Sequence, residues 1–374
     1  MKKLLCLLSA IMLMTAVSAY ADQHLEAFFI FSASESGRTE SLDLFEQDGS
    51  TYAVSTLFPE YAAGIGQEQP HFLDVFQQFC SLSPEKIRET TGQIGKMYTE
   101  WIEPQLSEPV YGTYAGELFE RAASIRYADF ALSDLTGYMK TAAGGISDSI
   151  PAFIAEAADQ SNEGGNLKIH YESYDNGSFI SAAILNGENI ISTLSADFHD
   201  EQESGFLICW KEEGRYYYRY ITVKDDSEKG ITVCSSLRSG NASTYQNISG
   251  KRPLLTETLL LTGNQFTIEI SADSVSAPVI IRGTADARED GNAFLNAEAS
   301  IAGQKNKMLD ISMNLEEMSR AVSFSDKKTV DCTDENAKAG ISLSATTHFM
   351  LLAAEILPTL PEDYKKLILK WLYP

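Results

Sequence analysis

The densest group of side chains that could bind a ligand lies near the middle of the sequence, where aromatic residues crowd two neighbouring segments. Trp210 is followed, across a short turn, by Tyr216, Tyr217, Tyr218 and Tyr220. Strand alternation places Tyr216, Tyr218 and Tyr220 on one face of their strand. Aromatic rings on a concave sheet can receive an apolar or sugar ligand, although cross-strand aromatic pairs also stabilise ordinary sheets. We predict Trp210, Tyr216, Tyr218 and Tyr220 as ligand-binding residues.

Adjacent acids form the second group that could do chemistry, because paired carboxylates serve hydrolysis or bind calcium. The four pairs are Glu212–Glu213, Asp225–Asp226, Glu289–Asp290 and Glu316–Glu317. Each pair falls at a predicted strand turn, where water hydrates the charges. A solvated structural role is the simpler interpretation, and we predict no catalytic residue among them.

Other motifs for catalysis or metal binding fail on their details. Ser83 and Lys86 fit the SxxK pattern of penicillin-recognising enzymes, but each partner element of that pattern is one residue wrong here. Ser83 is better explained as a helix N-cap before a proline at the first helical position. The five histidines are dispersed, and the sequence contains no HExxH, GxSxG or CxxC. We predict no catalytic residue, no metal site and no cofactor.

The N-terminus indicates export. Lys2 and Lys3 precede an apolar run from Leu4 to about Val17, and Ala19-Tyr20-Ala21 has small residues at the two positions that signal peptidase reads. We predict a signal peptide at 1–21 and a mature chain that begins at Asp22. The apolar run is shorter than the ~20 residues that cross a bilayer, so we predict no transmembrane anchor after cleavage. The expected location is extracellular, cell-surface or periplasmic.

The composition limits the partners. The chain of 374 residues carries a net charge of −23, and 44% of its residues are hydrophobic. The hydrophobic content suffices for a sizeable core. The negative field repels nucleic acid and anionic lipid headgroups, whose binding needs clustered Lys and Arg. We therefore predict no nucleic-acid partner, and a hydrophobic small molecule or a protein remains as the partner.

Four cysteines follow the predicted signal peptide: Cys80, Cys209, Cys234 and Cys332. Cys209 and Cys234 fall on strands with one strand between them, which separates the two by about 9.6 Å. That distance exceeds the reach of a disulfide. We predict that Cys209 and Cys234 are not bonded to each other.

The region 22–160 has a mixed pattern of strands and helices. Ala27 to Ser34 is an apolar strand-like run, and Asp48-Gly49 joins two further runs as a hairpin turn. Helical spacing follows Ser83, and 125–132 reads as another strand. The Gly- and Asn-rich linker at 161–166 is the predicted domain boundary.

The region 166–345 consists of strand-like runs between short turn clusters. Because those turns are too short for parallel crossovers, the sheet is predicted to be an antiparallel meander of eleven or twelve strands. Alternation at 309–316 gives one apolar and one solvated face. A one-sided meander must cover its apolar face, either by closing or by curling around something. The small residues Ala293, Ala297 and Ala299 leave room for a helix to approach.

The tail at 346–374 is predicted to be helical and to pack on the sheet. Its last segment, from Pro361, has an apolar stripe opposite Lys365, Lys366 and Lys370. Such a helix either docks on the sheet or lies at a membrane surface. The fold class is thus α+β: an N-terminal mixed segment, then a long curved, half-barrel-like antiparallel meander, then C-terminal amphipathic helices.

These features predict an exported, non-enzymatic envelope or secreted protein that binds a hydrophobic ligand or a protein partner on a curved β-sheet. In shape it is similar to lipoprotein-carrier half-barrels, an analogy of fold alone. Two alternatives stay open. One is an extracellular hydrolase whose carboxylates are assembled by the fold. The other is a structural or surface-interaction module.

Overall fold

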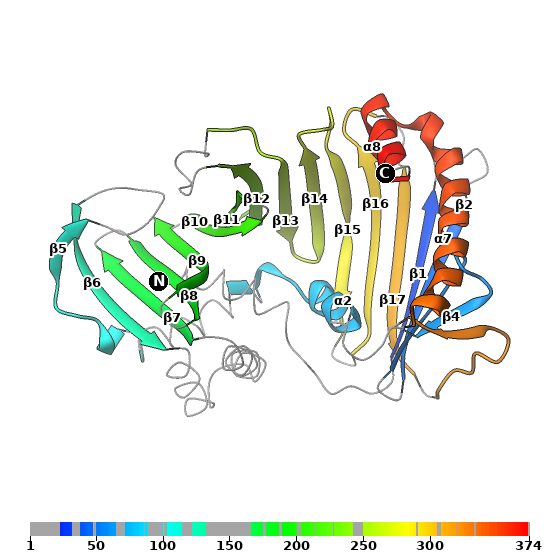
Figure 1. Cartoon of the computed structure of the whole chain (residues 1–374), viewed down its shortest axis with the longest axis horizontal. Helices are drawn as coiled ribbons and strands as arrows, with labels where there is room; N and C mark the ends of the chain where they lie inside the picture. The colour runs from blue at the N-terminus through cyan, green and yellow to red at the C-terminus, as the bar shows by residue number, and fades with distance from the viewer. Residues whose placement is uncertain are drawn as a thin grey trace. The chain divides into compact units, whose positions relative to one another are not determined.

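The fold is described from a computed structural model of the chain, which is mostly antiparallel β-sheet followed by two C-terminal helices (Figure 1). For 166–212 the structure describes the course of the backbone. The described residues are 23–31, 38–47, 50–64, 72–85, 87–88, 100, 103–113, 122–131, 166–174, 177–186, 189–199, 203–212, 214–226, 228–241, 250–288, 291–304, 308–318, 320–332 and 334–372.

The chain divides into two compact units, which we call the terminal unit (18–82 and 264–374) and the central unit (83–263). The terminal unit contains β1 (Gln23–Phe31), β2 (Arg38–Gln47), β3 (Ser50–Ser55), β4 (Tyr61–Gly64), α2 (Phe72–Cys80), β14 (Gln265–Ala272), β15 (Val279–Ala287), β16 (Ala293–Ile301), β17 (Leu309–Glu317), β18 (Lys328–Asp331), α7 (Glu335–Ile356), η3 (Leu357–Thr359) and α8 (Glu362–Leu372).

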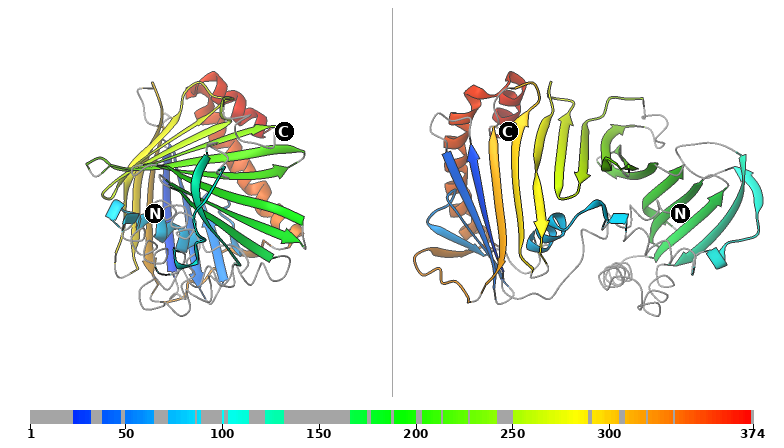
Figure 2. Two further views of the ribbon diagram at one scale, coloured as in Figure 1. Left: turned by 90° about the vertical axis from the view of Figure 1, so that its left-hand side faces the viewer. Right: turned by 180° about the vertical axis from the view of Figure 1, so that it is seen from behind.

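The sheet of the terminal unit brings the two ends of the sequence together. Strand β1 lies between β2 and β17 and pairs antiparallel with both (Figures 1 and 2). The order of pairing in this unit is β14–β15–β16–β17–β1–β2–β3–β4–β18. The predicted hairpin is confirmed, because Gln47 of β2 pairs with Ser50 of β3.

One pairing corrects the expectation of a wholly antiparallel sheet over 166–345. Strand β18 runs parallel to β4, with Lys328 opposite Tyr61 and Asp331 opposite Gly64. The short turns of the meander exclude parallel neighbours only between strands that are consecutive in sequence. The partner of β18 comes from the N-terminal region, and the long intervening chain permits either direction. Within each unit the remaining strands of 166–317 follow the predicted meander, and β18 brings the number of strands in 166–345 to twelve.

The buried face of this sheet is covered by helix. Buried side chains alternate along β16, where Ala293, Leu295, Ala297, Ala299 and Ile301 all have relative exposures of 9% or less. Helix α2 packs on β15 and β16. The expectation that a helix lies against the alanine row is therefore confirmed. The helix is α2 from the N-terminal region, however, and not the C-terminal helix that the sequence favoured.

The contacts of α2 show why it fits there. The ring of Phe79 meets that of Phe266 on β14 edge-on, with centroids 5.4 Å apart. The side-chain amide of Gln77 donates to the carbonyl of Gly291, at 3.1 Å, in the turn before β16. Leu73 and Phe76 are buried on the same helix. Small side chains on β16 let this apolar helix face approach closely.

The two C-terminal helices bury Ile341, Leu352 and Ala353 of α7 and also make polar contacts to the rest of the terminal unit. The Arg38 guanidinium on β2 pairs with Glu355 of α7 at 3.1 Å. At the start of α8, the Asp363 carboxylate accepts a hydrogen bond from the backbone N–H of Ser276 at 2.5 Å. The Tyr364 hydroxyl donates to the carbonyl of Ala277 at 2.6 Å. These bonds fix the N-terminus of α8 to the β14–β15 connection.

The strands of the central unit are antiparallel and pair in sequence order from β5 to β13. The predicted strand at 125–132 corresponds to β6. The predicted boundary at 161–166 lies outside the described residues, apart from Asn166 at the start of β7. The elements are η2 (Glu103–Gln105), β5 (Val110–Thr113), β6 (Ala122–Ala131), β7 (Asn166–Tyr174), β8 (Gly177–Asn186), β9 (Asn189–His199), β10 (Glu203–Glu212), β11 (Arg215–Asp226), β12 (Gly230–Gly240) and β13 (Leu255–Thr262).

We predict that Leu25→Ala destabilises the protein by about 2–5 kcal/mol, because a buried leucine is replaced by a cavity. Leu25 and its cross-strand partner Leu315 are both fully buried. Urea unfolding measures the change. The matched control is Leu343→Ala on α7, where the leucine is 71% exposed and the expected effect is within about 0.5 kcal/mol. Equal effects of the two substitutions would contradict the burial of the β1–β17 seam.

Candidate functional site

The predicted tyrosine row lies on β11, and its members differ in exposure. Tyr218 is fully buried, whereas Tyr216 and Tyr220 are half-buried. The rings of Tyr216 and Tyr218 are 6.5 Å apart between centroids and tilted to each other. Aromatic rings at this spacing stabilise a sheet face. A fully buried Tyr218 contributes to the packing of the central unit, and ligand contact by the row stays a prediction.

The strand register separates Trp210 from this row. Trp210 of β10 is directly opposite Tyr217, while Cys209 is opposite Tyr218 and Lys211 is opposite Tyr216. Directly opposite residues in an antiparallel pair share a face. Position 210 therefore belongs to the face of Tyr217, and the three tyrosines at 216, 218 and 220 belong to the other. The four predicted residues do not form one surface.

The acidic pair Asp225–Asp226 has the structural role that its position predicted. Asp225 at the end of β11 receives two hydrogen bonds from the Arg88 guanidinium, at 2.8 and 3.1 Å. The Asp226 carboxylate accepts from the backbone N–H groups of Glu228 and Lys229 in the turn to β12. These hydrogen bonds lower the pKa of Asp226. Both acids thus hold local structure.

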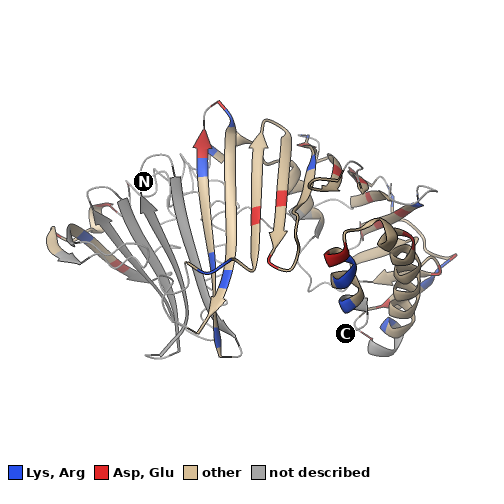
Figure 3. Ribbon diagram, turned by 90° about the horizontal axis from the view of Figure 1, so that it is seen from above, with Lys and Arg blue, Asp and Glu red and all other residues tan. Residues whose placement is uncertain are grey.

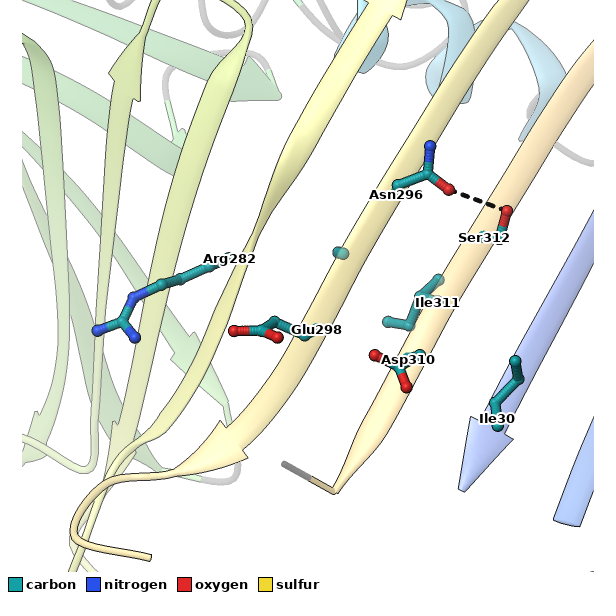
Figure 4. A pocket seen from close by; sticks show the side chains of 8 residues that line it. Ile30, Arg282, Asn296, Glu298, Asp310, Ile311 and Ser312 are labelled. Carbon is teal, nitrogen blue, oxygen red and sulfur yellow. Dashed lines mark hydrogen bonds between the residues drawn. The ribbon is translucent and has the colours of Figure 1, made fainter. Parts of the chain in front are cut away.

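A depression of about 340 Å³ opens on the solvent face of the terminal unit, opposite the face that α2 covers (Figure 4). It lies over β15, β16 and β17 and reaches the end of β1 at Ile30, which is 41% exposed. The residues that line it are Ile30, Arg282, Asn296, Ala297, Glu298, Asp310, Ile311 and Ser312. We call this surface the β15–β17 depression.

Two carboxylates meet in the β15–β17 depression. Glu298 of β16 is directly opposite Asp310 of β17, and Arg282 of β15 is opposite Glu298 from the other side. Ser312 donates a hydrogen bond to the Asn296 side-chain oxygen at 3.0 Å, which orients the amide beside the acids (Figure 4). Like charges directly opposite each other destabilise a sheet. With one arginine against two acids, the depression is negative and lined with hydrogen-bonding groups.

Sequence reasoning missed this pair because Glu298 and Asp310 are not adjacent in sequence. The acidic pairs that stand out in the sequence are adjacent residues at turns, whereas Glu298 and Asp310 meet only through the register of a hairpin. The available signal was the alternation of the two strands, which puts Asn296 and Glu298 on the same face as Asp310 and Ser312. Among the described residues, no group of three or more His, Cys, Asp or Glu side chains could hold a metal ion.

The described cysteines are free thiols: Cys80, Cys234 and Cys332. Strand β11 lies between the strands of Cys209 and Cys234, as the sequence predicted, so these two are not bonded. Cys80 is only 3% exposed, and burial raises the pKa of its thiol to about 12. Because the thiolate is the nucleophile, Cys80 is a packing residue of α2 at neutral pH.

We predict that Cys80 resists iodoacetamide at pH 8 in the native protein and reacts after unfolding, as followed by mass spectrometry of its peptide. The thiol of the unfolded chain ionises near its ordinary pKa of 9.0. Ionisation above that value favours unfolding, so the free energy of unfolding falls as the pH rises from about 9 toward 12. In a Cys80→Ser variant, the free energy of unfolding is expected not to show this fall between pH 9 and 12. Fast alkylation at pH 8 without denaturant would contradict the burial of Cys80.

Comparisons with known proteins assign no family. No family model matches the sequence, and no curated protein matches it. Among solved structures, two crystal structures of Pseudomonas aeruginosa OccK3 (OpdO) are similar. The first has a TM-score of 0.23 and 9% identity, and it covers 82% of this chain and 97% of that chain. The second has a TM-score of 0.21 and 9% identity, with 79% and 95% covered. Scores this low do not establish a shared fold.

Proposed function

We propose that this protein is an exported, non-enzymatic β-sheet scaffold whose β15–β17 depression binds basic side chains of a protein partner. The observation that carries the proposal is the pair Glu298 and Asp310, two acids directly opposite each other in an open depression. A like-charge pair weakens the sheet that contains it. Sequences depart from such local rules mainly at functional sites. A cationic side chain of a partner relieves the repulsion.

The packing of the terminal unit supports a protein partner over an apolar small molecule. An apolar ligand needs a concave apolar pocket. The apolar face of this sheet is instead filled by α2, whose Leu73, Phe76 and Cys80 are buried against it. The depression lies on the opposite, polar face and is open to solvent. Its lining suits charged and hydrogen-bonding groups on a partner's surface, with Ile30 as an apolar contact.

The net charge of −23 supports a cationic partner as well. A strongly negative protein attracts basic surfaces over a distance and speeds their encounter. The pattern at the N-terminus, with Lys2 and Lys3 before an apolar run, supports export. An exported acidic scaffold meets partners in the envelope or outside the cell.

The hydrolase alternative needs the same two carboxylates but a different environment. Its general acid must be kept neutral by burial in an apolar pocket. Glu298 is instead exposed to water on β16, and the depression is open. The geometry therefore favours binding over hydrolysis.

We predict that Glu298→Gln with Asp310→Asn weakens the binding of hexalysine about two- to thirtyfold, as measured by calorimetric titration at low salt. Removing the acids removes about 0.2–1 kcal/mol of attraction for each exposed ion pair. The affinity of the double variant also depends less steeply on salt, because fewer charges are paired on binding.

The matched control is Glu269→Gln with Asp273→Asn, which removes the same charge from exposed positions of β14 and the turn after it. This control is expected to bind hexalysine nearly as the unaltered protein does. Equal weakening in both double variants would show that hexalysine responds to net charge alone, and the depression would then not be a binding site.

A further inference from the structure

The longest helix among the described residues exposes an apolar surface that the fold leaves uncovered. Helix α7 has 22 residues, and no Asp, Glu, Lys or Arg occurs from 339 to 354. Leu343 is 71% exposed, Leu351 is 55% exposed and Met350 is 37% exposed. Apolar residues occur all around this helix, which is typical of helices surrounded by apolar material on every side.

By length and composition, the segment Lys338–Thr359 could cross a membrane, yet only 11% of it is buried within the protein. A core helix with this composition would be mostly buried, and a signal sequence would lie at the N-terminus. Neither explanation fits a C-terminal helix on which Leu343 and Leu351 face solvent. Its length of about 33 Å compares with the ~30 Å hydrocarbon core of a bilayer. The polar contacts of α7 lie on one side, through Glu355 to Arg38 and through Ser344 to the carbonyl of Leu57.

The adjoining helix α8 combines apolar and basic exposed residues. Leu367 and Leu369 are 47% and 43% exposed, and Lys366 and Lys370 are exposed one turn apart. Leucine beside lysine on a short amphipathic helix is the pattern of helices that lie in a lipid interface. The hydrogen bonds of Asp363 and Tyr364 to the β14–β15 connection hold the start of α8 in place.

The distribution of charge selects the occupant of this surface. Helices α7 and α8 together have four lysines and four acids, whereas the whole chain has a net charge of −23 (Figure 3). A second copy would bring its own Lys366 and Lys370 to the interface, where like charges repel. An anionic lipid headgroup would instead meet the opposite charge of Lys366 and Lys370 beside the exposed leucines of α8. Repulsion from the acidic remainder is screened beyond about 10 Å in salt.

We propose that the exposed surface of α7 and α8, formed by Leu343, Met350, Leu351, Lys366, Leu367, Leu369 and Lys370, binds the surface of an anionic lipid bilayer. The leucines and the methionine enter the interface, and the lysines contact lipid phosphates. This attachment is separate from the β15–β17 depression, which lies on a different surface of the terminal unit.

The test is flotation of the full chain, without its signal peptide, with vesicles of phosphatidylcholine and phosphatidylglycerol in equal parts. The protein is expected to float with these vesicles, and less with pure phosphatidylcholine. Leu343→Glu with Leu351→Glu is expected to lower the bound fraction tenfold or more. Lys366→Glu with Lys370→Glu is expected to remove the preference for phosphatidylglycerol.

The matched control is Val110→Glu with Val322→Glu, which adds the same charge at exposed apolar residues outside α7, α8 and the β15–β17 depression. It is expected to bind within twofold of the unaltered protein. Failure to float, or equal loss in the control, would overturn the proposal. So would a dimer in sedimentation velocity that Leu343→Glu with Leu351→Glu abolishes while no vesicle binding occurs, because a second copy would then cover α7. Hexalysine binding is expected to survive in all these variants, so the two proposals can fail separately.

Discussion

The insertion of β1 between β2 and β17 is the constraint on which the terminal unit depends. Strand β1 forms a nine-residue ladder with each neighbour, so its backbone hydrogen bonds are satisfied on both sides. The same register brings Leu25 and Ala27 into line with Leu315 and Met313 on one face. Without β1, the N-terminal hairpin and the end of the meander would have no shared core. The alanine row and its covering helix belong to that same continuous face.

The sequence predicted the parts of this fold that are local and missed those that join distant segments. Hairpins such as β2–β3 and β16–β17 follow from a turn between two alternating runs, and both are present. No local pattern could predict that β1 pairs with β17 or that β18 runs parallel to β4. Those pairings depend on which edges remain available after the hairpins form. The alanines of β16 predicted a helix but not which one, because small residues define a space and not its occupant.

The candidate sites show the same contrast between local features, which the sequence predicts, and features that join distant segments. Clustered aromatic side chains predicted Tyr216, Tyr218 and Tyr220 as ligand-binding residues, yet Tyr218 is buried in the sheet. Glu298 and Asp310 look like ordinary solvated acids until the register places one opposite the other. A pairwise charge relation between strands depends on a register that a single sequence specifies only through its turns. Rows of residues on a face can be predicted from alternation, but the neighbours across a strand pair require the structure.

The two faces of the terminal sheet show why binding is assigned to surfaces here and not to an interior. The apolar face must be shielded from water, and α2 packs on it over β15 and β16. The helix therefore occupies the space over these two strands that an apolar ligand would need. The polar face is in contact with water and carries two like charges directly opposite each other, which a core could not tolerate. Helix α7 is the exception, because its apolar residues exceed what the sheet can cover and Leu343 and Leu351 remain in water. Exposed apolar area of this kind has a free-energy cost of roughly 25 cal/mol per Å². A protein retains such a cost where a binding partner removes the apolar area from water. The surface of α7 and α8 has no acid from 339 to 354 and has lysines on α8, so it suits lipid better than another acidic protein.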